Sequence, residues 1–215
     1  MSVSKIIELT EPVHVLGKTE FRVLEGSVFI NGKFIDAVKN VDNSFLRLYS
    51  PRSTALIEIE PIGPGAKVEF KELSDGLEGI QTCQPNFGNI FEPENEMIES
   101  FELVIKGLYF LKDKNNTNVP VMRITEEWRQ VLTDLRTSPC PIIFVCGHRK
   151  VGKSSFSRFV LNGLLNNAEE IDFIDLDPGQ TEFTPAGFIS RMRFNKHGKY
   201  GYNDNLVNYL IFVLF

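Results

Sequence analysis

Residues 147–154 combine the residue types of a phosphate-binding loop at the spacing that such a loop needs. The run is Gly147-His148-Arg149-Lys150-Val151-Gly152-Lys153-Ser154, a complete G-x-x-x-x-G-K-S pattern. Glycines let the backbone curl so that successive N–H groups point at one anion, and the start of a following helix adds its dipole. In such loops the lysine contacts the β- and γ-phosphates, and the serine hydroxyl ligates Mg²⁺. The pattern predicts that the chain binds a nucleotide.

The neighbouring residues of this segment carry weaker expectations. Ser155 follows the motif and offers a second hydroxyl to the phosphates. Arg149 and Lys150 lie inside the loop, where contact with phosphate or substrate and a solvated loop tip are both open. His148 is expected to be a loop residue rather than a catalyst.

Two carboxylates follow the next apolar run, at Asp175 and Asp177. The carboxyl ends of strands in a parallel sheet line the ligand crevice, so both acids are expected near the phosphates. They are two residues apart along a strand, which predicts that they point to the same side. A carboxylate there can hold the metal or accept a proton from an attacking hydroxyl. The two acids can exchange these roles, and the sequence does not decide between them.

The segments on either side of the loop predict the sheet that would position these residues. Residues 141–146 are an apolar run of strand length, as expected for a strand covered on both faces. Apolar residues at helical spacing between 153 and 165 predict an amphipathic helix, and residues 171–175 predict the next strand. Strand, helix and strand in this order form a βαβ unit with a parallel sheet, for which residues 186–190 are a candidate third strand.

The first half of the chain predicts a small antiparallel β unit. Asn31-Gly32, between two apolar runs, is the strongest hairpin signal, because both residues tolerate the positive φ angles of a two-residue turn. Further strands are expected at 56–60, at 67–71 and within 101–111, with a break at 61–65 and an irregular segment at 74–100. This arrangement favours a β-sandwich-like domain.

A helix is predicted between the two halves. Thr125 followed by two glutamates is typical of a helix start, with a hydroxyl cap and acids in the first turn. The side chains that share its apolar face are Trp128, Val131, Leu132 and Leu135. Trp128 is expected to be a core residue rather than a platform for a base, and the helix is expected to stop before Ser138.

Composition places the chain among ordinary globular proteins. Of its 215 residues, 42% are hydrophobic and 24% are charged, which excludes disorder and collagen-like repeats. The net charge of −5 gives no sign of a whole-chain nucleic-acid binder. The three cysteines (Cys83, Cys140 and Cys146) form neither an even set nor a metal-ligand spacing, which indicates a reducing interior.

Two sequence patterns exclude further classes. Residues 1–10 lack the basic start and apolar run of a signal peptide. The apolar stretch 206–215 has about half the length needed to cross a bilayer, so we expect a soluble intracellular protein with no membrane partner. An Asn-Lys-x-Asp run for guanine recognition does not occur in the sequence, which disfavours a GTPase switch.

Taken together, these motifs resemble those of the polynucleotide 5′-hydroxyl kinase family. The resemblance is close over residues 128–191 and rests most on Asp-Pro-Gly-Gln-Thr-Glu-Phe-Thr-Pro at 177–185, with 145–158 and Leu161-Asn162. The 177–185 run is more similar to the branch that acts in ribosomal RNA precursor processing than to the pre-mRNA cleavage-factor branch. The β-rich unit, the helix and the phosphate loop also follow the family's order.

The resemblance implies an enzyme that uses ATP and Mg²⁺ and acts on RNA with a 5′-hydroxyl end. Residues 147–155 would hold ATP with Gln180 beside the site, and Ser154 and Asp175 would hold Mg²⁺. Asp177 would be the general base for the RNA 5′-hydroxyl. The implied catalytic residues are Lys153, Asp177 and Asp175. The family also implies a partner endonuclease of the pre-rRNA processing complex and a location in the nucleus and nucleolus.

The chain departs from the family pattern after about residue 193. Family members continue with more of the sheet, an RNA clasp and an arginine-bearing lid, so we expect a chain that is truncated relative to them. The alternative function is then a catalytically inactive, ATP-binding scaffold of an RNA-processing complex. A local basic run favours either RNA contact or a solvated tail; it consists of Arg191, Arg193, Lys196 and Lys199.

These expectations divide an α/β chain into four parts. They are an N-terminal β-rich domain (1–111), a linker with a helix (112–140), the N-terminal part of a P-loop kinase domain with an incomplete parallel sheet and flanking helices (141–193), and an atypical tail (194–215).

Overall fold

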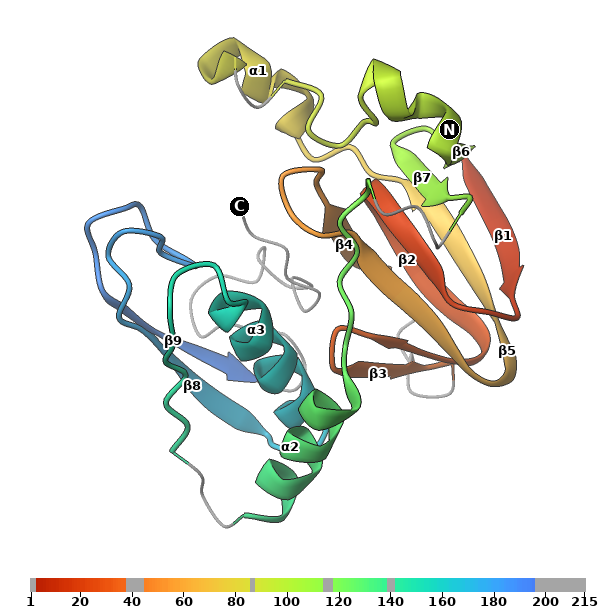
Figure 1. Ribbon diagram of the computed structural model, residues 1–215. Helices are drawn as coiled ribbons and strands as arrows, with labels where there is room; N and C mark the ends of the chain where they lie inside the picture. Colours follow the sequence, from red (N-terminus) through yellow and green to blue (C-terminus); the bar gives the residue numbers. More distant parts are fainter. Residues whose placement is uncertain (1–2, 38–44, 86–87, 114–117, 139–141, 196–215) are drawn as a thin grey trace.

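The computed structural model describes residues 3–37, 45–85, 88–113, 118–138 and 142–195. Figure 1 shows a large N-terminal sheet and, beside it, a smaller C-terminal group of two helices and a hairpin. The sheet contains β1 (Ser4–Leu9), β2 (Val13–Ile30), β3 (Lys33–Asp36), β4 (Leu46–Ser50), β5 (Ile57–Glu72), β6 (Phe101–Ile105) and β7 (Leu108–Leu111). The C-terminal group contains α2 (Glu126–Thr137), α3 (Lys153–Leu164), β8 (Glu170–Asp175) and β9 (Ser190–Asn195). Short helical segments are Leu77–Gly79, α1 (Ile80–Cys83) and Asn95–Ser100.

The N-terminal sheet curls around the long strand β2, which pairs with β3, β4, β5 and β7. The β1–β5, β2–β3, β2–β4, β2–β7 and β6–β7 pairs are antiparallel. Fully buried side chains such as Phe21, Val68 and Phe70 fill its inner face. The β-rich unit expected from the sequence is therefore confirmed, but it is one curled sheet of seven strands and not a sandwich of two.

Local turn chemistry explains how β2 connects to β3. Ile30 lies opposite Lys33, and the two residues between them have positive φ angles, 44° at Asn31 and 89° at Gly32, as the sequence predicted. The expected break at 61–65 is wrong, because β5 continues through it as one bent strand with a left-handed residue at Gly63.

The helix predicted after Thr125 is α2. The Thr125 side chain accepts a hydrogen bond from the backbone N–H of Trp128 at 3.4 Å, and the helix ends at Thr137, as expected. Leu132 is buried and packs in the core together with Trp128. Val131 is 41% exposed, so its assignment to the apolar face is wrong.

The parallel sheet expected in the second half is not formed by the described residues. α3 begins and ends close to its predicted limits, but residues 142–147 have no regular secondary structure, and 186–189 precede β9 rather than form a strand. β8 pairs antiparallel with β9. An apolar run becomes a buried strand only where neighbours supply a ladder and cover its faces. Within the described part of the chain Ile142 and Phe144 lack that cover, at 99% and 76% exposure.

The β2–β3 turn lies against α3 and joins the two halves of the molecule. Phe29 packs with the buried Phe159 of α3. The side-chain amide of Asn162, also in α3, donates to the backbone oxygen of Asn31 at 2.9 Å. A Cβ on Gly32 would lie 2.3 Å from the backbone oxygen of Phe159, so only glycine fits this approach. α3 is thus fixed directly to the sheet.

Several expectations concern the edges of the described structure. Arg191 and Arg193 both pair with Asp172, at 2.6 and 3.0 Å, and are exposed. Among the described residues, no helix has the length and apolarity that a membrane crossing requires. Cys140, Lys196, Lys199 and the apolar stretch 206–215 lie outside the described residues.

Candidate nucleotide-binding site

The predicted phosphate loop leads directly into α3. Gly152 is the N-cap of the helix and has a left-handed φ of 89°, and Lys150 two residues earlier has a φ of 64°. A Cβ on Gly152 would meet nothing within 4 Å, so glycine is favoured there by backbone conformation and not by crowding. The chain therefore turns sharply between the exposed loop tip and the first helical residue.

The lysine of the motif folds back across this loop. The Nζ of Lys153 donates to the backbone oxygen of His148 at 2.9 Å. The first N–H groups of a helix have no intrahelical acceptor, so those of Lys153, Ser154 and Ser155 face the loop side of α3. The lysine ammonium, these N–H donors and the positive end of the helix dipole together favour the binding of an anion.

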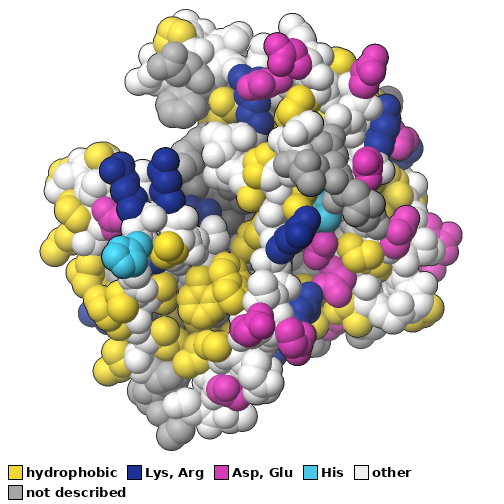
Figure 2. Space-filling view, in the orientation of Figure 1, with side chains coloured by type: hydrophobic (Ala, Val, Ile, Leu, Met, Phe, Trp, Pro, Cys, Tyr) yellow, Lys and Arg dark blue, Asp and Glu magenta, His cyan; other side chains and the backbone are white. Residues whose placement is uncertain are grey.

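The remaining loop residues lie at the surface. His148, Arg149 and Lys150 are exposed, as is Ser154, whereas Ser155 is half-buried. Figure 2 shows Lys and Arg side chains gathered near a histidine at one end of the C-terminal group, next to a larger area of hydrophobic side chains. This surface is open to an anionic ligand.

The first acid of the candidate site accepts a backbone hydrogen bond on each of its carboxylate oxygens. Asp175 is the last residue of β8 and is 8% exposed. Its Oδ1 accepts from the N–H of Asp177 at 3.0 Å, and its Oδ2 accepts from the N–H of Glu182 at 2.5 Å. Asp175 therefore ties the two ends of the following turn together.

The second acid lies in that turn and is exposed. The Oδ1 of Asp177 accepts from the N–H groups of Gly179 and Gln180, at 3.0 and 3.1 Å. Among the described residues, no hydrogen bond is formed by its Oδ2. The sequence predicted that the two acids lie on the same face of one strand. Asp177 instead follows the end of β8, and the two acids belong to one turn.

The structure brings the candidate residues together as two groups, both attached to α3. Residues 147–155 form the loop and first turn of the helix, and Asp175, Asp177 and Gln180 form the acidic turn. An ion pair between Arg158 in the second turn of α3 and Glu182 joins the acidic turn to the helix. The distal guanidinium nitrogen of Arg158 lies 3.0 Å from Glu182 Oε2.

Arg158 and Glu182 are the residues of this region to which the sequence gave no role. The sequence offered one indication of a pair: Arg158 and Glu182 have opposite charges and lie in 145–158 and 177–185, two stretches that carry the family resemblance. Their side chains are only 14% and 8% exposed, so this ion pair is shielded from solvent, unlike an ordinary surface salt bridge.

The described part of the chain contains no cluster of three or more His, Cys, Asp or Glu side chains that could hold a metal ion. Mg²⁺ at phosphate sites is commonly held by one or two protein oxygens together with the phosphates and water. The exposed hydroxyl of Ser154 fits that role. Each oxygen of Asp175 accepts one backbone hydrogen bond and keeps a second lone pair, so its predicted role as a metal ligand stays a prediction.

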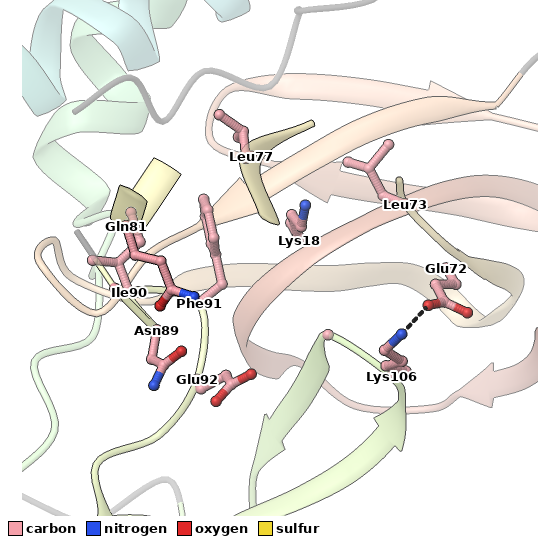
Figure 3. Close-up of a pocket in the computed structure, with 12 residues that line it drawn as sticks. Lys18, Glu72, Leu73, Leu77, Gln81, Asn89, Ile90, Phe91, Glu92 and Lys106 are labelled. Atoms are coloured by element: carbon pink, nitrogen blue, oxygen red, sulfur yellow. Dashed lines mark ion pairs between the residues drawn. The ribbon is translucent and has the colours of Figure 1, made fainter. Parts of the chain in front are cut away.

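A cavity of about 220 Å³ lies elsewhere, against the N-terminal sheet. Figure 3 shows that Lys106 and Glu72 at its margin form an ion pair, at 3.0 Å. Lys18, which also lines it, pairs with Asp75 at 2.7 Å. None of the candidate site residues is among those that line this cavity.

Comparison with known proteins shows which proteins the chain is similar to. The model of the family "mRNA cleavage and polyadenylation factor CLP1 P-loop" matches residues 147–209. The polynucleotide 5′-hydroxyl-kinase NOL9 of Bos taurus is 33% identical over 135 residues, which cover 56% of this chain and 19% of that protein. NOL9 of Homo sapiens is 32% identical over 137 residues, covering 60% and 19%. Residues 147–209 of the chain therefore match a CLP1-type P-loop segment.

More distant matches extend over more of the chain. The polynucleotide 5′-hydroxyl-kinase grc3 of Aspergillus clavatus is 26% identical over 199 residues, which cover 81% of this chain and 23% of that protein. The solved complex of wild-type Clp1p with Pcf11p has a TM-score of 0.47 at 17% identity, over 89% of this chain and 36% of that one. The chain is similar to polynucleotide 5′-hydroxyl-kinases of the NOL9 and Grc3 type, and it spans 19% of the length of the two mammalian relatives.

Proposed function

We propose that the chain is the nucleotide-binding part of an ATP-dependent polynucleotide 5′-hydroxyl kinase that transfers the γ-phosphate of ATP to RNA 5′-hydroxyl ends in rRNA precursor processing. The observation that supports this most is the loop geometry, with a left-handed Gly152 and the Lys153 ammonium folded back to His148 at the start of α3. The similarity to proteins named polynucleotide 5′-hydroxyl-kinases supports a polynucleotide 5′-hydroxyl end as the acceptor. The processing role, a partner endonuclease and a nucleolar location belong to the same proposal.

Each group has a distinct role in this proposal. The N–H groups at the start of α3 and the Lys153 ammonium bind the phosphates and neutralise negative charge that develops during transfer. Mg²⁺, when bound, supplies further charge neutralisation on the phosphate oxygens, with Ser154 as its protein ligand. The exposed Asp177 accepts the proton of the RNA 5′-hydroxyl through Oδ2, while Asp175 holds the turn. Gln180 lies beside Asp177 in that turn.

Transfer to labelled RNA tests this function directly. The chain is incubated with γ-labelled ATP, Mg²⁺ and an RNA oligonucleotide that has a 5′-hydroxyl, and the label is expected on the RNA. The same oligonucleotide with a 5′-phosphate is expected to stay unlabelled. Lys153→Ala should lower transfer by about 10²–10³-fold, as for loss of other charge-stabilising donors, whereas Lys67→Ala, which removes a lysine paired with Glu25 on the N-terminal sheet, should not. Absence of ATP binding by the unsubstituted chain would refute the proposal.

A second candidate is an ATP-binding scaffold without transfer activity. The exposure of Ile142 and Phe144 favours it, because the segment before the loop is not held in a sheet by the described residues. The scaffold predicts ATP binding that is lost in Lys153→Ala, together with no labelling of RNA at any protein concentration. The same experiment therefore separates the two candidates.

A further inference from the structure

The acidic turn is joined to α3 by one nearly buried ion pair. Arg158 and Glu182 contact each other through two nitrogen–oxygen pairs, and both side chains are shielded from solvent. Such a bidentate pair fixes direction as well as distance, since the guanidinium and carboxylate planes must align. The backbone around Glu182 is therefore held at a defined place beside the second turn of α3.

Glu182 is also connected to the acids through the backbone. Its N–H donates to Asp175 Oδ2, and Asp175 Oδ1 in turn accepts from the N–H of Asp177. On the far side of the turn Phe183 packs edge-on against Phe173 of β8, with ring centroids 5.3 Å apart. The ion pair is thus the polar end of a continuous set of contacts that leads from α3 to Asp177.

Stability alone is a weak reason for such a pair. Taking two charges out of water costs free energy that their attraction often only balances, so a buried ion pair contributes little compared with apolar side chains of the same size. What it does supply is a fixed geometry. Because the phosphate loop begins the same helix, that geometry relates the loop to the acidic turn.

We propose that Arg158 and Glu182 are positioning residues that hold the Asp177 carboxylate in place relative to the phosphate loop. This inference rests on the proposed function, in which Asp177 receives the proton of the attacking hydroxyl. A displacement of about 1 Å in a reacting group can lower a rate by about 10²-fold. Loss of the pair should therefore reduce transfer while the phosphate loop itself stays intact.

Glu182→Gln removes one charge of the pair with little change in volume, and Glu60→Gln is a matched control. Glu60 forms an ion pair of 2.7 Å with Arg129 that joins β5 to α2, away from the turn. In Glu182→Gln we expect kcat for RNA labelling to fall by about 10²-fold with KM for ATP unchanged. In Glu60→Gln we expect neither value to change. A parallel loss of ATP affinity and kcat in Glu182→Gln would overturn the inference.

Amide hydrogen exchange gives a second test that does not need transfer. The N–H groups of Gly179, Gln180 and Glu182 are bonded to the two aspartates and are expected to exchange faster in Glu182→Gln. ATP with Mg²⁺ should slow their exchange in the unsubstituted chain and not in this variant. If the unsubstituted chain binds ATP but labels no RNA, the kinase proposal fails, and this exchange difference still supports the coupling. Equal exchange in the two proteins would overturn it.

Discussion

Replacement of Gly32 by alanine tests whether the β2–β3 turn is fixed to α3. Gly32 has a φ of 89°, and an added Cβ would lie 2.3 Å from the backbone oxygen of Phe159 and 3.1 Å from the N–H nitrogen of Gly163. These neighbours are helix backbone, which cannot rotate aside as a flexible side chain can. The substitution must therefore either deform the turn or push α3 away from it.

Gly63→Ala is the matched control, and the comparison gives the magnitude. Gly63 also has a left-handed φ, 74°, but a Cβ there would meet nothing within 4 Å. Both substitutions should cost about 1–2 kcal/mol for an alanine in the left-handed region. Gly32→Ala should cost a further 1–3 kcal/mol or so, the usual range for forcing extra atoms into a packed contact.

Urea unfolding measures the two costs. The fluorescence of Trp128 is a local probe, because it is the one tryptophan of the sequence and its ring lies 5.6 Å from that of Phe159. The circular dichroism signal should report the same order of stability. Equal losses of unfolding free energy in Gly32→Ala and Gly63→Ala would show that the turn does not press on α3, and would refute the packing described above.

Three further predictions follow from single contacts. Asn162→Ala leaves the buried backbone oxygen of Asn31 without its donor and should lower the free energy of unfolding by about 1–3 kcal/mol in urea. Thr125→Ala removes the cap of α2 and should cost about 1 kcal/mol, seen as faster amide exchange in the first turn of that helix only. Hydrogen bonds from Arg193 and then Arg191 hold the pKa of Asp172 below its usual range, so Arg193→Ala should raise that pKa in an NMR titration. Because the folded-state pKa is depressed, any stabilisation from this group is present above the ordinary aspartate pKa and is lost as the pH falls; an unchanged titration would contradict the pairing.

The features that sequence alone predicted are those set by neighbouring residues. Asn31-Gly32 gives a two-residue turn wherever it joins two strands, and Thr125 caps a helix by a contact within one turn. The apolar spacing of α3 is local in the same sense. The phosphate loop also belongs here, since its glycines and Lys153 act within eight consecutive positions.

The features that sequence did not predict depend on distant partners. The apolar run at 142–146 has the composition of a buried strand, but its pairing is decided by which other strand lies beside it. β8 pairs with β9 across the whole acidic turn, and no local pattern fixes that register. β5 remains one strand through 61–65 because β2 offers it partners on both sides of the bend, including Val15 opposite Ile57 and Val23 opposite Val68.

α3, and not a parallel sheet, is the element that relates the parts of the candidate site within the described structure. Its first turn contains Lys153, its second turn binds Glu182 through Arg158, and its later turns bind the β2–β3 turn through Asn162. Because a helix is stiff along its axis, the distances between Lys153, Arg158 and Asn162 stay the same when a ligand binds at one of them. The N-terminal sheet therefore contributes to the position of the phosphate loop through α3. Gly32 illustrates this dependence. An added methyl group there would press on the backbone of α3, the helix whose first turn follows the phosphate loop.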